Sequence, residues 1–192
     1  TPNEEAIRDY LLGFEGVYGA ADYVTANLSS PNTKGLRDLQ NAETCRALIG
    51  QLQAKRTELQ ATHGGKYVPI VIKIAPDLSE EAIEALAGVF SETGVDGIIT
   101  TNTTIDRDAV AGHALAGEGG GLSGTPLIGK STLVLKRLRE KLDASIPVIG
   151  SGGVMSADDA KAKFDAGAAL VQVYTGLVYR GPKLIQEIAA LS

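Results

Sequence analysis

The fold is decided by residues 68–101, which read VPIVIKIAPDLSEEAIEALAGVFSETGVDGIITT. Two short apolar runs, 68–74 and 97–101, flank a segment with helical periodicity. Ser79 predicts the N-cap of that helix, with acidic residues in its first turn, and Gly94 suits its C-terminal end. Near-continuous apolar runs indicate strands buried on both faces, and therefore a parallel sheet. The apolar face of the helix consists of Ile83, Leu86, Ala87 and Phe90.

The same strand–loop–helix unit recurs five times along the chain. Five such units predict the α/β class, and both an open doubly wound sheet and a (β/α)8 barrel fit them. Polar groups follow every predicted strand, which favours the barrel, because barrels build their sites from the carboxyl ends of many strands. The other strands are expected at 23–28, 147–150 and 170–174, with helices over 41–63 and 131–142 and a third that Ser156 begins and Gly167 ends.

Length and composition narrow the class of protein. The 192 residues suffice for one domain with its own core, and the net charge of −5 argues against general nucleic-acid binding. No apolar run approaches the length of a membrane span, and no basic-then-apolar leader is visible. Cys45 is the only cysteine and is expected to be structural, while His63 and His113 lie apart. We therefore expect no metal site and a reducing, cytoplasmic setting.

Lys73 is unusual because it lies inside an apolar strand. A strand buried on both faces offers no solvent to an ammonium group, so Lys73 requires an anionic partner. Contact with a ligand is favoured over a structural ion pair. Residues 29–33, Ser-Ser-Pro-Asn-Thr, have the composition of a turn, or else Ser30 acts as a base or nucleophile. No histidine lies near Ser30 in sequence, which disfavours an ordinary serine hydrolase.

Two further loops carry candidate chemistry. Residues 101–104, Thr-Asn-Thr-Thr, either cap local structure or bind a polar planar ligand, since asparagine offers both donors and an acceptor. Residues 150–153, Gly-Ser-Gly-Gly, precede the helix capped by Ser156 and predict a phosphate-binding loop. They do not match the dinucleotide fingerprint, and no Walker lysine follows. The loop 105–124 holds six glycines and is expected to be mobile or to face a ligand.

Taken in order, these motifs resemble dihydroorotate dehydrogenase, specifically the quinone-linked class 2 enzymes. Each motif alone is weak, but the ordered set covers almost the whole chain and is highly specific. The matching segments are NLSSPNT at 27–33 with GLR at 35–37, VIKIAPDL at 71–78, DGII at 96–99, TNTT at 101–104, GGLSG at 120–124, IPVIGSGG at 146–153, LVQVYTG at 170–176 and GP at 181–182.

The resemblance implies an FMN enzyme on a (β/α)8 TIM barrel that oxidises dihydroorotate to orotate in pyrimidine biosynthesis. Electrons then pass to a membrane quinone. Ser30 matches the catalytic base of class 2, where class 1 has cysteine, and Thr33 with a water is the expected proton relay. Substrate contacts are implied for Asn27, Asn32, Asn102 and Thr103. Flavin contacts are implied for Asn27, Lys73, Thr101, Gly124, Gly152, Gly153, Tyr174 and Thr175.

The resemblance also implies that part of the family's barrel lies outside this sequence. The family's first strands and its N-terminal quinone-binding helices have no counterpart, so 1–192 is expected to form one partial barrel domain with about the last five β/α units. The full-length protein would be cytoplasmic and peripheral on the cytoplasmic side of the inner membrane. Two alternatives remain: an inactive truncated barrel that keeps only phosphate- or FMN-binding loops, and another phosphate-binding barrel with Lys73 as a Schiff-base lysine.

Overall fold

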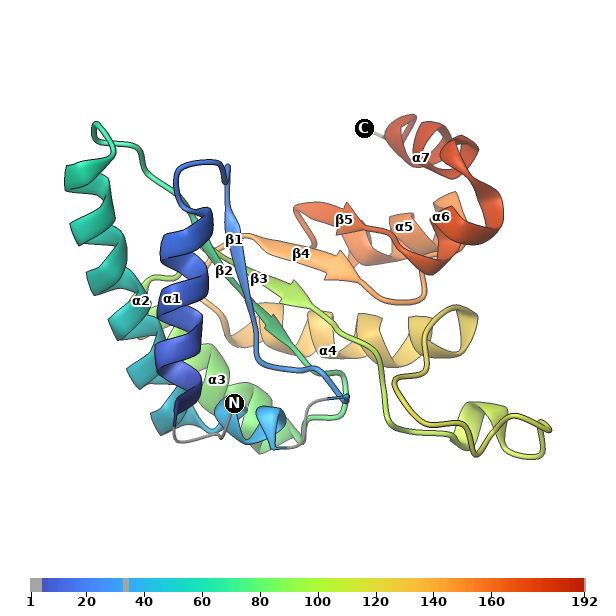
Figure 1. The fold of residues 1–192 in the computed structure, drawn as a ribbon. Coiled ribbons are helices and arrows are strands. Elements are labelled where there is room, and N and C mark those ends of the chain that lie inside the picture. The colour runs from blue at the N-terminus through green and yellow to red at the C-terminus, as the bar shows by residue number, and fades with distance from the viewer. Residues whose placement is uncertain (1–4, 33–34, 192) are drawn as a thin grey trace.

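The sheet sets the architecture of the molecule. The computed structural model describes residues 5–32 and 35–191 (Figure 1). Its five strands are all parallel and lie side by side in the order of the sequence. All carboxyl ends therefore lie at one edge, as in part of a β/α barrel. The strands are β1 (Val24–Asn27), β2 (Ile70–Ile74), β3 (Gly97–Thr100), β4 (Val148–Ser151) and β5 (Leu170–Gln172).

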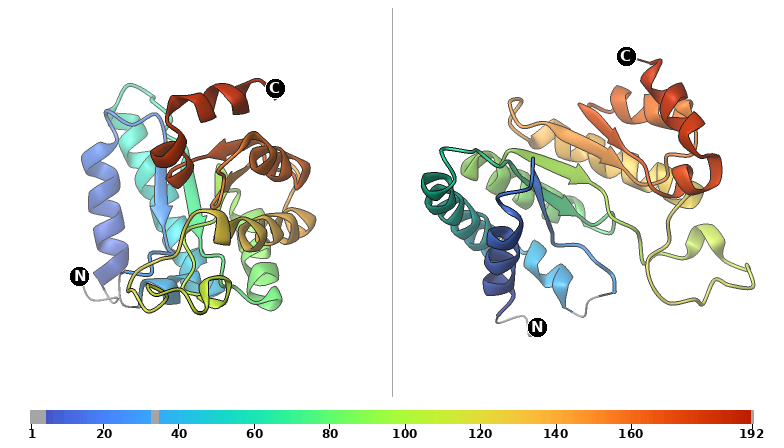
Figure 2. Two further views of the ribbon diagram at one scale, coloured as in Figure 1. Left: turned by 90° about the vertical axis from the view of Figure 1, so that its right-hand side faces the viewer. Right: turned by 45° about the horizontal axis from the view of Figure 1, so that its top comes forward.

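The helices follow the strands around one side of the sheet (Figures 1 and 2). Successive helices contact one another, α1 with α2, α2 with α3, α3 with α4 and α4 with α5. This arrangement follows from right-handed crossovers between neighbouring parallel strands. The helices are α1 (Ala6–Val17), α2 (Ala42–Thr62), α3 (Glu80–Thr93), α4 (Ile128–Lys141), α5 (Ala157–Asp165), α6 (Thr175–Arg180) and α7 (Pro182–Ala189).

The predicted helix caps are confirmed. The Ser79 side chain accepts the Ala82 N–H at 3.2 Å, and Gly94 ends α3 with a φ of 62°. Ser156 likewise caps α5. The helix predicted from residue 131 begins earlier, at Ile128. A 3₁₀ turn containing Pro126 leads straight into it, and the pyrrolidine φ already suits a first helical turn.

The apolar core lies between the sheet and its helices. β3 is buried along its whole length, and Tyr18, Phe14 and Phe90 are the largest apolar side chains in the core. The expectation of burial on both faces is wrong for β5, because Leu170 is 61% exposed. Within the described part of the chain, β4 is the only strand that pairs with β5, so one edge of this strand has no covering neighbour.

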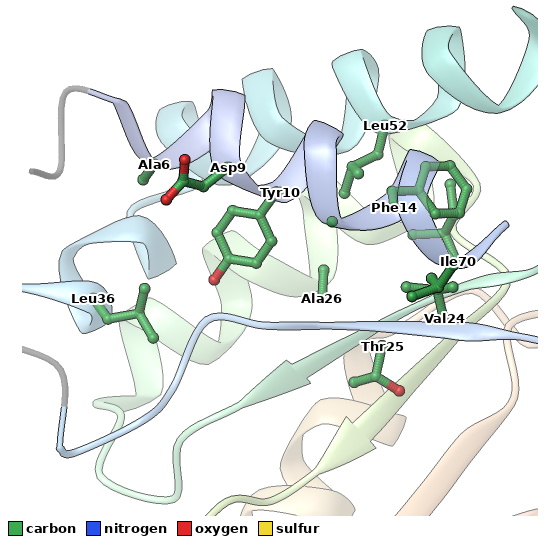
Figure 3. A pocket seen from close by; sticks show the side chains of 12 residues that line it. Ala6, Asp9, Tyr10, Phe14, Val24, Thr25, Ala26, Leu36, Leu52 and Ile70 are labelled. Carbon is green, nitrogen blue, oxygen red and sulfur yellow. The ribbon is translucent and has the colours of Figure 1, made fainter. Parts of the chain in front are cut away.

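A hollow of about 510 Å³ separates α1 from β1. Figure 3 shows Tyr10 and Phe14 of α1 facing it, with Val24 and Ala26 of β1 on the other side. Its lining is mainly apolar, and it lies along the length of β1 rather than at the strand ends. No helix of the described residues is long and apolar enough to cross a bilayer.

Gly150 of β4 packs closely against side chains of α4 and α5. A Cβ at this position would lie 2.9 Å from the Lys163 Cβ and 3.1 Å from the Leu135 Cδ1. Gly150→Ala should therefore destabilise the fold by about 1–3 kcal/mol through overpacking. Gly88→Ala is the control, because Gly88 lies in α3 with open space around it and should stabilise by about 0.5–1 kcal/mol. Urea unfolding checks both, and equal effects would contradict the packing assigned to Gly150.

Candidate active site

A cavity of about 380 Å³ lies at the carboxyl edge of the sheet. Its walls come from the ends of β2, β3, β4 and β5 and from the loop before α4. Parallel β/α folds bind ligands at this edge, because the strand–helix loops converge there. The lining residues are Lys73, Thr101, Asn102, Thr103, Ser123, Leu127, Ser151, Gly152, Gly153, Val154, Gln172, Val173, Tyr174, Thr175 and Gly176.

The glycine loop after β4 has the geometry of an anion site. Gly152 and Gly153 adopt φ angles of 95° and 83°, which side-chain-bearing residues avoid. A Cβ on Gly153 would lie 2.5 Å from the Ile128 Cα, so only glycine fits against α4. Within the described residues, the N–H groups of Gly152, Gly153 and Val154 donate no hydrogen bond. Backbone N–H groups of this kind bind phosphate oxygens well.

Lys73 supplies a positive charge to the cavity from another strand. It is the penultimate residue of β2 and is only partly exposed. The one polar contact of its Nζ in the described structure is a long one, 3.4 Å to the Gln172 side-chain oxygen. Burial lowers the pKa of the Lys73 ammonium below its ordinary value. No carboxylate pairs with Lys73 among the described salt bridges, which favours ligand contact over the structural ion pair.

Asn27, Ser29 and Asn102 form one hydrogen-bonded group at the ends of β1 and β3. The Asn102 amide donates to the Asn27 Oδ1 and to the Ser29 Oγ, both at 3.1 Å. Ser29 is fully buried and donates from its Oγ toward the Asn27 Oδ1 at 2.9 Å or the Lys73 carbonyl at 3.0 Å. The Asn27 Nδ2 has no acceptor within the described part of the chain, so its two hydrogens remain available to a ligand.

Ser30 lies in a loop that packs against the glycine-rich segment. The Ser30 Oγ accepts the Asn32 N–H at 3.3 Å. A Cβ at Gly120 would come 3.3 Å from the Asn32 Oδ1, and one at Gly121 would lie 2.9 Å from the Pro31 ring. The loop 105–124 therefore contacts the serine loop and extends from the carboxyl edge of the sheet (Figure 1). Thr33, the expected relay residue, lies outside the described residues.

A charged cluster ties these loops together beside the cavity. Arg37 donates to the Asp77 carboxylate at 2.8 Å and to the Thr103 carbonyl at 3.1 Å. Lys130 donates to Asp77 at 2.9 Å, and the Thr104 hydroxyl also donates to that carboxylate. Burial alone would raise the pKa of Asp77. Hydrogen bonds from Thr104, Lys130, Ile105 and Arg37 outweigh it and lower this pKa below its ordinary value.

The structure brings most of the predicted site residues to one cavity. Eight line it directly, whereas four lie elsewhere. Asn27 joins the cavity through Asn102, and Gly124 lies beside it, since a Cβ there would meet the Thr175 methyl at 3.5 Å. Ser30 and Asn32 belong to the adjoining loop and do not line the cavity. The lining members are Lys73, Thr101, Asn102, Thr103, Gly152, Gly153, Tyr174 and Thr175.

Sequence reasoning missed three residues that organise the site: Ser29, Asp77 and Gln172. Asp77 lies three residues after the end of a buried strand, and that position is a usable signal, because polar residues at strand ends gather at one edge of a parallel sheet. Ser29 and Gln172 carry no comparable signal. A serine in a turn and a glutamine in a strand look ordinary until their partners, 44 and 99 residues away, are known.

These features define a class of protein: a β/α-barrel fold with a phosphate-type glycine loop and a buried lysine at one cavity. A family model described as dihydroorotate dehydrogenase matches residues 2–190. The chain is 57% identical over 187 residues to the dihydroorotate dehydrogenase (quinone) of Xanthomonas euvesicatoria and 54% identical to that of Stenotrophomonas maltophilia. The chain therefore belongs to the dihydroorotate dehydrogenase family.

Solved structures agree with this assignment. Ligand-free dihydroorotate dehydrogenase from Eimeria tenella has a TM-score of 0.90 at 39% identity, covering 99% of this chain and 55% of that one. The same enzyme in complex with ferulenol has a TM-score of 0.89 at 38% identity, covering 96% and 52%. The two bacterial matches cover 97% of this chain and 53% of the relative. The chain thus spans about half the length of the curated relatives it matches.

Asp77 offers a pH-dependent test of the charged cluster. Its folded-state pKa is depressed, so its contribution to stability is complete above the unfolded value of about 3.9 and disappears as pH falls through the lower folded value. Asp77→Asn should therefore cost about 1–3 kcal/mol at pH 6. The difference in stability between the variant and the parent protein should begin to narrow below about pH 4 and close only as pH falls through the lower folded-state pKa.

Asp165→Asn is the control for Asp77, because Asp165 forms only an exposed pair with Lys161 on α5. It should change stability by less than about 0.5 kcal/mol. Denaturant unfolding across pH 3–7 measures both variants. If the loss of stability in Asp77→Asn is as large at pH 3 as at pH 6, the contribution of Asp77 does not have an ionic origin.

Proposed function

We propose that this chain supplies the substrate- and flavin-binding face of a quinone-dependent dihydroorotate dehydrogenase, which oxidises dihydroorotate to orotate. The observation that carries the proposal is the convergence on one cavity of Lys73, the glycine loop at 152–153 and Asn102. These residues come from different strands, and each stands at the position that the family motifs assign. The names of the curated relatives support quinone as the electron acceptor.

The residues of the cavity fit FMN as the cofactor. Free N–H groups at Gly152 and Gly153 suit the phosphate, and the missing Cβ atoms let this loop pack against the start of α4. Lys73 also lines the cavity, and its ammonium group would stabilise negative charge on the flavin ring. Thr101, Gly124, Tyr174 and Thr175 complete the proposed flavin contacts. When bound, FMN supplies the hydride acceptor for substrate oxidation.

The asparagine group suits a planar substrate with imide and carboxylate edges. The Asn102 amide is held by Asn27 and Ser29, and its Oδ1 accepts the Thr103 N–H at 2.8 Å. Asn102 is thereby fixed in orientation, while the Asn27 Nδ2 remains free to donate. Asn32 and Thr103 stand at the adjoining loops and complete the proposed substrate contacts.

Ser30 is the proposed base. Its Oγ removes a proton from the substrate carbon next to the carbonyl, while hydride leaves the neighbouring ring carbon. A serine hydroxyl is a weak base near neutral pH, so the proton needs an onward path, for which we propose Thr33 and a water. The Asn32 N–H at the Ser30 Oγ holds the hydroxyl in place and leaves its hydrogen free to be passed on.

A binding-only protein is the alternative, since the glycine loop and Lys73 are formed within this chain alone. It would hold FMN or phosphate without oxidising dihydroorotate. It remains a prediction that residues 1–192 form one partial barrel domain. Peripheral contact with the inner membrane, through a region outside this sequence, also remains a prediction.

Ser30→Ala tests the catalytic assignment in the full-length protein. Loss of the base should lower kcat at least about 100-fold, because general-base catalysis contributes about 10²–10⁴-fold. Bound flavin, measured by its visible absorbance, should stay at the parental level, since Ser30 does not line the cavity. Unchanged turnover of dihydroorotate in Ser30→Ala would contradict the role of Ser30 as the base.

Lys73→Met tests the flavin assignment. Loss of the ammonium should weaken FMN binding about 10–100-fold, which corresponds to one charged hydrogen bond. The flavin-free variant should melt no lower than the parent, because a half-buried charge without an ionic partner is removed. Lys136→Met on the exposed face of α4 is the control and should leave flavin affinity unchanged. Flavin fluorescence titration measures the FMN affinity of both variants. If Lys73→Met binds FMN as tightly as the parent protein, Lys73 does not contact the flavin.

A further inference from the structure

Lys163 is buried where few lysines are found. Its side chain has no exposed surface, and its Cβ packs against Gly150 of β4. The Nζ donates to the Ser131 Oγ of α4 at 2.5 Å, its one hydrogen-bond partner within the described residues. Burial lowers the pKa of Lys163 to about 7, against an opposing effect of Asp159. Burying an amine with a single hydroxyl partner costs free energy of folding, because the group loses its contacts with water. Such a group therefore adds little to the stability of the protein.

Ser131 connects this lysine to the glycine loop. The Ser131 Oγ lies 2.8 Å from the Gly152 carbonyl oxygen and 3.1 Å from the Ile128 carbonyl oxygen. The hydroxyl has a single hydrogen, and Lys163 donates to its lone pair. The shorter distance favours donation to Gly152. A chain of two hydrogen bonds therefore runs from α5 through α4 to the loop after β4.

The peptide between Gly152 and Gly153 transmits this contact to the cavity. It is planar and trans, so its C=O and N–H point in opposite directions. Ser131 holds the carbonyl toward α4, behind the loop. The Gly153 N–H is therefore directed away from α4, and both glycines line the cavity. This N–H has no acceptor within the described part of the chain, which is the state expected of a donor reserved for a ligand.

We propose that Lys163 and Ser131 are positioning residues beneath the glycine loop, which orient the Gly153 N–H toward the phosphate monoester of a ligand in the cavity. The inference rests on the proposed function for its choice of FMN as ligand. The relay itself requires only a phosphate group. Neither residue lines the cavity, so each acts through the peptide that it holds.

The test compares FMN with riboflavin, which lacks the phosphate. Dissociation constants are measured by flavin fluorescence in the full-length protein and in the variants Lys163→Met and Ser131→Ala. Each variant should lower the preference for FMN over riboflavin about tenfold, while its affinity for riboflavin stays at the parental level. A merely structural role would weaken both flavins alike, and that result, or an unchanged preference, would overturn the proposal.

Thr132→Val is the matched control. Thr132 follows Ser131 in α4, and its buried hydroxyl has no hydrogen-bond partner among the described residues. Its removal should leave the FMN preference unchanged. If Lys163→Met does not fold, Ser131→Ala carries the test, because it removes one hydroxyl and no charge. Loss of FMN preference in Thr132→Val as large as in Ser131→Ala would also overturn the relay.

The outcome separates this proposal from the function on which it rests. A parent protein that prefers FMN to riboflavin but does not oxidise dihydroorotate would refute the proposed enzyme, and the variants would still test the relay. A parent protein with no preference between the two flavins would refute the phosphate site and the relay together, whatever its activity.

Discussion

The site depends on the parallel, in-sequence pairing of the five strands. The ladder places Asn27 opposite Lys73, Ile74 opposite Thr100, and Ser151 opposite Gln172. Groups that are 99 residues apart in sequence, such as Lys73 and Gln172, come within reach because each strand ends at the same edge. A shift of one residue in any pair would move its side chains to the other face of the sheet. The register therefore fixes the donor set of the cavity.

Close approach of backbone to backbone is the second constraint. Gly153 packs against the first turn of α4, and Gly176 packs against the Val154 carbonyl with no room for a Cβ. Gly121 similarly has no room for a Cβ beside the Thr103 side chain. Gly153 and Gly176 thus meet backbone atoms of neighbouring segments, whereas Gly121 meets a side chain. The cavity lining accordingly includes glycine backbone and small polar side chains, which suits a phosphorylated ligand.

Charged side chains near the carboxyl edge of the sheet differ in whether they have an ionic partner. Asp77 is neutralised by Arg37 and Lys130, and the cluster connects the serine loop to the loop after β3. Lys73 lines the cavity and Lys163 does not, and neither has a carboxylate partner within hydrogen-bonding distance in the described structure. The ammonium group of Lys73, which has no ionic partner there, favours an anionic ligand in the cavity.

The sequence by itself determined the strand–helix units, the caps at Ser79 and Ser156, the glycine loop at 150–153 and the family. These features are local, since hydrophobic periodicity, capping chemistry and positive φ angles depend on neighbours in the chain. Tertiary structure alone decided that Ser29 holds Asn102, that Asp77 joins Arg37 to Lys130, that Leu170 of β5 is exposed, and that Lys163 reaches Ser131. The direction of a hydroxyl or an ammonium group depends on partners brought near by packing, and no local pattern encodes them.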